Sequence, residues 1–408
     1  MHRVLCVIGM LFLSTAAFAD LNVRDFGAKG DSTTDDTAAF QKALDDAGKT
    51  GDIVHVPPGR YAIHGHIAIP KSVTLQGTFT APPATVDSKS SKGSMLLAYE
   101  GKGKDSGPAF ITLHTNSTIK GIIVFYPEQT IDVQPYPWCV HGSGDDCSII
   151  NCLLINPYQA VDFGTDPCGR HFIDGLYAQA LKTGLLIDKC YDVGRISNIH
   201  FWPFWTESLM DWTKKNGTAF IIARTDWEYV NNCFAISYNV GFHFRAFKDG
   251  PGNAILTESG SDIGPCAVKV DETQGHAGVS FVNSQFMCGV EVAPTNAGPV
   301  KFTACGFWGY GKTDTIAKLN GSGLTTFTAC HFISWGQVNQ TAPAIVAETG
   351  SVTLNGCEFL DREPEKVHLQ LDKAVESAII MGNRFRSKPQ IKNRSEGDVQ
   401  IGLNSGGK

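Results

Sequence analysis

Six short segments of this sequence place residues capable of acid–base chemistry at equivalent positions. The second residue of each segment, and most of the fourth residues, are apolar and would point into a core, whereas the third and fifth would point outward. The segments begin at Ala160, Gly184, Ser208, Gly241, Ala267 and Gly289. Their third residues are Asp162, Leu186, Met210, His243, Lys269 and Glu291, and their fifth are Gly164, Asp188, Trp212, Arg245, Asp271 and Ala293. Stacked segments would form a strip of mixed charge, where we expect a substrate groove.

Carboxylates in this strip could supply the acid and the base of glycoside hydrolysis. That reaction needs two carboxyl groups about 5 Å apart for retention of configuration, or about 6.5–9.5 Å apart for inversion. Parallel strands stack about 4.8 Å apart, so residues one or two strands apart meet those separations. The candidate catalytic pairs are Asp162 with Asp188, Glu207 with Asp188, and Asp271 with Glu291.

Aromatic and basic residues beside the carboxylates suggest how a sugar would be held. Flat aromatic rings stack on the C–H faces of sugars, and the candidates are Trp202, Trp205 and Trp212. The basic candidates are Arg224, His243, Arg245 and Lys269. These basic side chains could instead neutralise a uronate carboxylate and remove the neighbouring proton, which is the chemistry of a polysaccharide lyase.

The strip depends on a repeat whose clearest copy is V-T-L-N-G-C-E-F, from Val352 to Phe359. Its last residue serves as an anchor, with an apolar residue five before it and a small residue two before it. The anchors are Thr80, Val124, Leu154, Ala178, Phe201, Ala235, Gly260, Phe286, Phe307, Phe332, Phe359 and Phe385. Their spacing is about 25 residues, which indicates a solenoid of about 12 β-strand coils. The first interval, 44 residues, would hide one further copy.

The cysteines follow the same repeat. Five of the twelve stand two residues before an anchor, where a small apolar side chain fills the core: Cys152, Cys233, Cys305, Cys330 and Cys357. No C-x-x-C pair suggests zinc, so we expect no metal site. Cys266 and Cys288 fall at one position on adjacent coils, and that spacing predicts a disulfide between them.

The N-terminal region predicts a cap for the first coil. Thr34 or Asp35 could begin a short amphipathic helix that ends at Gly48. The segments around it are D-F-G-A-K-G-D from Asp25, D-D-T from Asp35 and V-P-P-G-R-Y from Val56. They resemble the opening of the pectate-lyase-like superfamily, in the branch of rhamnogalacturonases, epimerases and phage tailspikes. The resemblance implies an all-β, right-handed parallel β-helix with an N-terminal capping helix.

A second resemblance concerns Gly144-Asp145-Asp146-Cys147, which is similar to the G-D-D-C of polygalacturonases. In that family the motif comes after an anchor and before a groove strand. Here it precedes Ile149, on a different turn of the coil, and the family's G-H-G and R-I-K motifs are missing. Polygalacturonase chemistry is therefore not expected.

The composition and the ends of the chain bound its class. The net charge is −6 over 408 residues, which argues against a nucleic-acid binder. Residues 1–19 read as a signal peptide, because basic Arg3, an apolar run and Ala17-Phe18-Ala19 follow one another. No later run is long enough to span a membrane. We therefore expect a secreted or periplasmic protein with one β-helix domain at 20–385, capped by 20–50, and a polar tail at 386–408.

Three functions stay open at this stage. The first is a glycoside hydrolase that uses paired carboxylates, acts on a polysaccharide or oligosaccharide and needs no cofactor, because no carboxylate cluster has calcium spacing. The second is a polysaccharide lyase acting on a uronate polymer, for which calcium would be a candidate cofactor. The third is a glycan-binding or tailspike-like adhesin without turnover. Relatives that form trimers make a homotrimer the alternative to a monomer.

Overall fold

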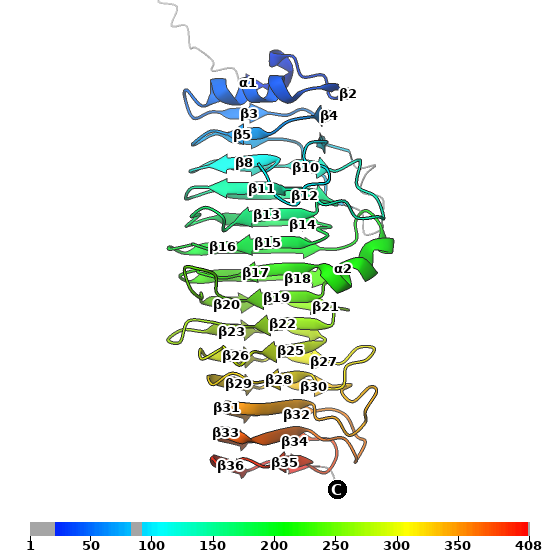
Figure 1. The fold of residues 1–408 in the computed structure, drawn as a ribbon, viewed down its shortest axis with the longest axis vertical. Coiled ribbons are helices and arrows are strands. Elements are labelled where there is room, and N and C mark those ends of the chain that lie inside the picture. The colour runs from blue at the N-terminus through cyan, green and yellow to red at the C-terminus, as the bar shows by residue number, and fades with distance from the viewer. Residues whose placement is uncertain (1–20, 83–91, 407–408) are drawn as a thin grey trace, which may run out of the picture.

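The chain forms a parallel β-helix, as the repeat predicts (Figure 1). The computed structural model describes residues 21–82 and 92–406. The coils stack along one axis, and strands on each face pair in parallel with their counterparts on the neighbouring coil. The predicted signal peptide lies outside the described residues. None of the helices within the described ranges is long and apolar enough to cross a membrane.

Each coil contributes strands to three faces, here called A, B and C. Face A consists of β1 Leu21–Asn22, β3 Ile53–His55, β6 Thr74–Gln76, β9 Thr118–Lys120, β12 Ser148–Ile155, β14 Phe172–Ala178, β16 Gly194–Phe201, β18 Glu228–Ile236, β20 Ala254–Thr257, β23 Val279–Val282, β26 Val300–Thr303, β29 Leu324–Thr328, the later parts of β31 Ile345–Asn355 and β33 Leu369–Met381, and β36 Asp398–Gly402. Several of these strands run on into face B.

The other two faces are built in the same way. Face B consists of β2 Asp31–Asp35, β4 Gly59–Ile63, β7 Ser94–Ala98, β10 Ile122–Phe125, the ends of β12, β14, β16 and β18, and then β21 Gly260–Asp262, β24 Gln285–Met287, β27 Gly306–Trp308, β30 His331–Ile333, β32 Glu358–Phe359, β34 Arg384–Phe385 and β37 Ser405–Gly406. Face C consists of β5 Ile67–Ile69, β8 Ile111–His114, β11 Trp138–Ser143, β13 Gln159–Phe163, β15 Thr183–Ile187, β17 Thr218–Ile222, β19 Val240–Phe244, β22 Cys266–Val270, β25 Gly289–Val292, β28 Ala317–Leu319, the first parts of β31 and β33, and β35 Ile391–Asn393.

The repeated motif is the corner between faces A and B. Three residues before most anchors the backbone takes a positive φ, as at Gly356 (65°) and Asn232 (49°). One residue in the left-handed region turns the chain sharply, which favours glycine and asparagine there. The apolar residues on either side, such as Leu354 and Phe359, then both point inward and are buried. The motif therefore encodes a bend as well as two strands.

Aromatic stacks run through the core along the axis. The rings of Phe281, Phe302 and Phe327 stack with centroids 5.0 and 5.1 Å apart on successive coils. A second stack joins Phe307, Phe332, Phe359 and Phe385. The five cysteines predicted as core fillers are all buried, so that interpretation is confirmed.

The capping helix is also confirmed, one residue later than predicted. Helix α1 spans Thr37–Ala47, with Asp36 at its N-cap and Gly48 at its C-cap. The Asp36 carboxylate does not cap the helix; it accepts the backbone N–H groups of Lys29 and Gly30 at 2.6 and 3.0 Å. It thus ties the loop before the helix to the helix start. In Figure 1, α1 lies across the end of the first coils.

Two predictions about the length of the coils are wrong. Leu75 of β6 pairs directly with Ile119 of β9, so the first interval contains one long coil with an excursion after Gln76, and no hidden copy. The β-helix also continues past Phe385. Strands β35, β36 and β37 pair with β33 and β34, so most of the region predicted as a polar tail belongs to further coils.

The predicted disulfide is wrong as well. Cys266 and Cys288 are both buried free thiols. A register shift between Cys266 and Val268 brings Gly289, and not Cys288, opposite Cys266. Cys288 itself has a φ of 124°, and such an irregular backbone breaks the simple stacking that the prediction assumed.

Candidate functional site

The outward strip predicted on six segments exists on face C, with one exception. Asp162 pairs with Leu186, His243 with Lys269, and Lys269 with Glu291, each in register on neighbouring strands. The exception is the segment at Ser208, whose position is taken by β17, with Ile221 between Leu186 and His243. Met210 and Trp212 lie on helix α2 (Met210–Asn216), which projects from the side of the solenoid in Figure 1.

Four of the predicted site residues form one cluster on β19 and β22. The Nε2 atom of His243 lies 2.6 Å from Oδ2 of Asp271, one coil further along. Lys269 Nζ lies 3.5 Å from the other carboxylate oxygen of Asp271. Arg245 follows two residues after His243 on the same face, and its guanidinium lies 4.6 Å from the ring centroid of Phe247. We call His243, Arg245, Lys269 and Asp271 the central cluster.

The protonation of His243 follows from its surroundings. Burial lowers the pKa of His243 below its ordinary value of 6.5, and the charges of Lys269 and Arg245 act in the same direction against the hydrogen bond with Asp271. The imidazole is therefore neutral at neutral pH. Its Nε2 donates its proton to the carboxylate of Asp271, which leaves the lone pair on Nδ1. Nδ1 has no hydrogen-bond partner within the described residues and is the basic atom of the cluster.

Arg245 adds a second indication that the central cluster receives a ligand. Its Nε atom is buried and has no hydrogen-bond partner in the part of the chain that the structure describes. An unpaired buried N–H is costly, and an anionic group bound beside it would satisfy it. The cluster thus combines a neutral base, two cations and an unmet donor.

A second polar group on face C was missed by the sequence analysis. His141 of β11 lies one strand before Asp162, with its Nδ1 atom 2.9 Å from Oδ2 of Asp162 and its Nε2 atom 3.2 Å from Oδ2 of Asp166. Ser143 donates to Asp166 at 2.9 Å. His141 and Asp162 line a cavity of about 410 Å³, together with Trp138 and the segment 105–109. The alternation of Trp138–Ser143 carries the signal that could have identified it.

In this group Asp162 has a positioning role. It is only 1% exposed and accepts hydrogen bonds from the backbone N–H groups of Gly164 and Thr165 as well as from His141. Burial alone would raise the pKa of Asp162, but these hydrogen bonds outweigh it and the pKa is lowered. The hydrogen bond with Asp162 in turn raises the pKa of His141. Asp162 therefore holds His141 and does not face a substrate as a free carboxylate.

Glu291 lies at the other end of the strip, beside an open cavity. This cavity has a volume of about 380 Å³ and is lined by Glu291, Lys318, Tyr310 and the segment 312–315. Glu291 is exposed and directly follows Lys269 in the column. Glu291 is thus one strand away from Lys269 of the central cluster.

Asp188 and Arg224 belong to the rim where face C turns toward face A. Asp188 is 4% exposed and accepts the backbone N–H of Arg224 at 2.9 Å, and burial raises the pKa of Asp188. The Arg224 guanidinium pairs with Asp226 at 2.6 Å and stacks over Tyr191. Both side chains are thus engaged at the rim.

The remaining predicted residues do not line the strip. Glu207 lies exposed on the short helix η3 (Glu207–Leu209). Trp202 and Trp205 pack against the apolar outer side of face B, next to Phe204. Trp212 alone approaches face C, with its ring 6.2 Å from that of Tyr158, which precedes β13. Catalysis by Glu207 and sugar stacking by Trp202 and Trp205 are therefore not supported.

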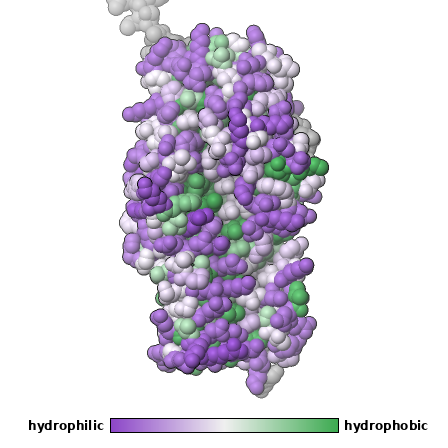
Figure 2. All heavy atoms as spheres, viewed as in Figure 1, coloured by the Kyte–Doolittle hydropathy of each residue, from purple (hydrophilic) through white to green (hydrophobic). Residues whose placement is uncertain are grey.

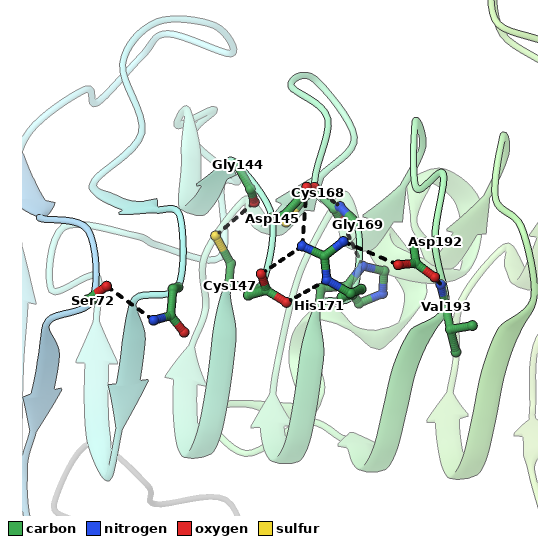
Figure 3. A network of polar contacts seen from close by, with 12 residues as sticks. Ser72, Gly144, Asp145, Cys147, Cys168, Gly169, His171, Asp192 and Val193 are labelled. Atoms are coloured by element: carbon green, nitrogen blue, oxygen red, sulfur yellow. Dashed lines mark hydrogen bonds and ion pairs between the residues drawn. The ribbon is translucent and has the colours of Figure 1, made fainter.

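The Gly144–Cys147 motif lies in the turn from face C to face A, as its phase predicted. Figure 3 shows Asp145 and Asp192 on two such turns, with the turn of Cys168 and Gly169 between them. Between them Arg170 binds Asp146 at 2.8 Å and Asp192 at 3.2 Å. This ladder of exposed ion pairs fastens consecutive turns. Elsewhere on the face seen in Figure 2 the surface is mostly hydrophilic, with scattered hydrophobic spots.

The N-terminal third of the chain is similar to a known protein family. Residues 21–157 match the family described as "Rhamnogalacturonase A/epimerase, pectate lyase-like". Alginate lyase 7 of Azotobacter vinelandii is 53% identical over 47 residues, 11% of this chain and 6% of that protein. An exopolygalacturonase of Arabidopsis thaliana is 38% identical over 80 residues, 18% of each chain. The matches thus span less than a fifth of either relative.

Among solved structures, the A-module of a mannuronan C-5 epimerase from Azotobacter vinelandii aligns with a TM-score of 0.46 at 12% identity, over 95% of this chain and 100% of that one. The DFA-IIIase of Arthrobacter chlorophenolicus, without its lid, aligns with a TM-score of 0.48 at 12% identity, over 95% and 92% of the two chains. The family match covers the capping helix and the first coils, and the same coil geometry continues beyond it. This chain is a parallel β-helix protein whose residues 21–157 match a pectate-lyase-like family.

Proposed function

We propose that this protein is an enzyme that acts on a uronate-containing polysaccharide by removing the proton next to the uronate carboxylate, as a polysaccharide lyase does. The observation that carries the proposal is the central cluster. His243 offers a neutral base, held by Asp271, beside the positive charges of Lys269 and Arg245. The matched segments of an alginate lyase and of uronate epimerases support the same substrate class, because both reactions begin with this proton transfer.

The residues of the central cluster could carry out each step of the elimination. The uronate carboxylate binds Arg245 and Lys269, whose charges stabilise the electron density that develops when the neighbouring C–H bond breaks. His243 Nδ1 takes the proton, while Asp271 stabilises the resulting imidazolium. The electron pair forms a C=C bond as the glycosidic C–O bond breaks, and the departing oxygen takes a proton from solvent.

Hydrolysis by paired carboxylates is the second candidate. The structure leaves only one of the three carboxylate pairs that the sequence predicted. Of the three predicted pairs, two include Asp188, which is buried at the rim. Asp271 and Glu291 remain, on adjacent coils. Glu291 lines the cavity of about 380 Å³, and Asp271 is not among its lining residues. Asp271, however, is already bonded to His243 and Lys269, so a free acid–base pair would require that cluster to open.

One experiment separates these reactions. The purified full chain is incubated with polymannuronate, polyguluronate and polygalacturonate, and with a neutral glucan as the control polymer. Reducing ends and near-ultraviolet absorbance are followed together. We expect new reducing ends accompanied by an absorbance rise from the new C=C bond, on a uronate polymer only.

Two results would overturn the proposal. Reducing ends without any absorbance rise would indicate hydrolysis, and would point to Asp271 and Glu291. Binding without new ends on any polymer, and without exchange of substrate protons in deuterated water, would indicate a glycan-binding protein without turnover.

A further inference from the structure

A buried charged pair lies inside the solenoid, apart from the strip on face C. His171 precedes β14 and Glu228 begins β18, and both side chains are completely buried. Nε2 of His171 lies 2.8 Å from Oε1 of Glu228, although 57 residues separate them in the chain. The cost of burying a carboxylate and an imidazolium away from water is high, and a pair of this kind seldom stabilises a fold by itself. The presence of this pair in the core therefore suggests a role other than stabilising the fold by itself.

A glycine makes room for the pair. On the coil between the two residues the equivalent position is Gly194, which pairs with Glu228. A Cβ atom on Gly194 would collide with the carboxylate of Glu228 and the ring of His171. His171 and Glu228 therefore meet across a position on the intervening coil that has no side chain. A larger residue than glycine at position 194 would prevent this contact.

The thiol of Cys190 lies next to this pair. Cys190, also completely buried, lies in the turn that follows β15. Its Sγ atom, one nitrogen of His171 and one oxygen of Glu228 all lie within 4.8 Å of one another. Imidazole nitrogen, thiolate and carboxylate are the donors that zinc prefers. In the described parts of the chain this is the one such group of three.

Hydrogen bonds on the far sides of His171 and Glu228 hold both side chains in fixed orientations, as in metal sites. Nδ1 of His171 donates to the carbonyl of Cys168 at 2.8 Å, so Nε2 is the nitrogen that faces the other donors. Thr225 donates to Oε2 of Glu228 at 3.2 Å. Such hydrogen bonds from the far side of a ligand fix its tautomer and direction in metal sites. Figure 3 shows His171 and Cys168 in the turn between Asp145 and Asp192.

We propose that His171, Cys190 and Glu228 form a structural zinc site. A divalent ion would take the place of the proton between His171 and Glu228 and of the thiol proton of Cys190. The sum of Zn²⁺, one thiolate and one carboxylate is neutral, which suits a site without access to water. A tetrahedral ion would have one coordination position beyond these three ligands. Because the site is enclosed, the ion enters as the chain folds.

The test uses the full chain, unfolded and refolded with Zn²⁺, with Co²⁺ or with a chelator, and then desalted. We expect about one metal ion per chain by elemental analysis after refolding with Zn²⁺. With Co²⁺ we expect the near-ultraviolet charge-transfer band of a cobalt–thiolate bond. The zinc-loaded protein should melt roughly 5 °C above the chelator-treated protein, the shift expected for tight binding to a chain of this size.

Two variants test the ligands, and a third serves as the control. Cys190→Ser and Glu228→Gln should each reduce the bound zinc to below about a tenth of an ion per chain, and Cys190→Ser should also remove the cobalt–thiolate band. The matched control is Cys233→Ser on the same strand as Glu228. Ser259 occupies the equivalent place one coil on, with its hydroxyl bonded to a backbone carbonyl as the Cys233 thiol is, so this variant should fold and keep its zinc.

Two outcomes would overturn the proposal. One is a refolded wild-type chain that holds neither zinc nor cobalt and melts at the same temperature with or without chelator. His171 and Glu228 would then be a buried ion pair only. The other is full zinc occupancy in folded Cys190→Ser and Glu228→Gln, which would place the metal elsewhere.

Discussion

The imidazole of His243 and the carboxylate of Asp271 meet at 2.6 Å across neighbouring coils. This contact predicts the behaviour of two variants. His243→Ala should lower kcat/KM on a uronate polymer by roughly 10²–10⁴-fold, because the proton acceptor is lost. The measurement is the initial rate of absorbance increase. His331→Ala on face B is the matched control, and an equal loss of rate in that variant would indicate a general defect in folding.

The same contact predicts the pH dependence of the rate. The base must be neutral, and burial holds the pKa of His243 below 6.5. The rate should therefore be constant at neutral pH and fall on acidification below pH 6.5. Asp271 favours the imidazolium, so Asp271→Asn should move this acidic limb to lower pH while reducing the maximal rate. A limb that stays in place in Asp271→Asn would contradict the assignment of His243.

Asp162 should matter for stability more than for chemistry. It accepts three hydrogen bonds while almost completely buried. Asp162→Asn keeps one oxygen for the two backbone N–H groups that share Oδ1. It places an NH2 group where the charged Oδ2 meets His141, and this should cost about 2–3 kcal/mol in the free energy of unfolding. Asp166→Asn, at a half-exposed carboxylate, should cost less than about 1 kcal/mol. Equilibrium denaturation of both variants checks the difference, and similar losses would refute it.

The aromatic stack in the core predicts that substitutions on the inward and outward sides of β29 differ greatly in their effect on stability. Phe327 is completely buried between Phe302 and the next coil. Phe327→Ala should cost about 3–5 kcal/mol, because it removes buried surface and leaves a cavity. Leu324→Ala, at a 41% exposed position on the same strand, should change stability by less than about 1 kcal/mol. Thermal unfolding of the pair would reveal whether the two faces of β29 differ in this way.

His368 predicts how stability changes with pH. It is buried against Phe359 and Phe385, and burial lowers the pKa of His368 to about 4. The unfolded chain takes up this proton first, near pH 6.5. The contribution of His368 is therefore complete above pH 6.5 and is lost as the pH falls toward 4, by roughly 3 kcal/mol in all. His368→Asn should unfold with a shallower pH dependence between these values; an unchanged slope would contradict the prediction.

The outward-facing residues of face C could be predicted from the sequence wherever successive coils have similar lengths. Between Gly241 and Val292 the alternation of inward and outward residues predicts the register of β19, β22 and β25 correctly, because a period of two leaves little freedom once one side is buried. The segment at Ser208 failed because α2 and its loop are inserted before β17. Asp211, a charged residue at an inward position, was the warning in the sequence.

Other parts of the site depend on contacts that spacing along the chain does not reveal. The anchor at Gly260 is displaced by one residue: Leu256, and not Ile255, pairs with Val230. His171 and Glu228 meet only because Gly194 leaves the coil between them empty. The phase of a repeat predicts which way a side chain points, but not how far it reaches or what it meets.

The stacking of face C has a consequence for how such a protein can change its substrate. His141 and His243 are four rungs apart, through Asp162, Leu186 and Ile221, or roughly 19 Å at the spacing of parallel strands. Duplication or loss of a coil would alter this separation by a whole rung while each remaining coil kept its neighbours. Under the proposed function, the gain or loss of a coil would therefore change the length of sugar chain that spans the two groups in steps of one rung, while the residues at either end stayed the same.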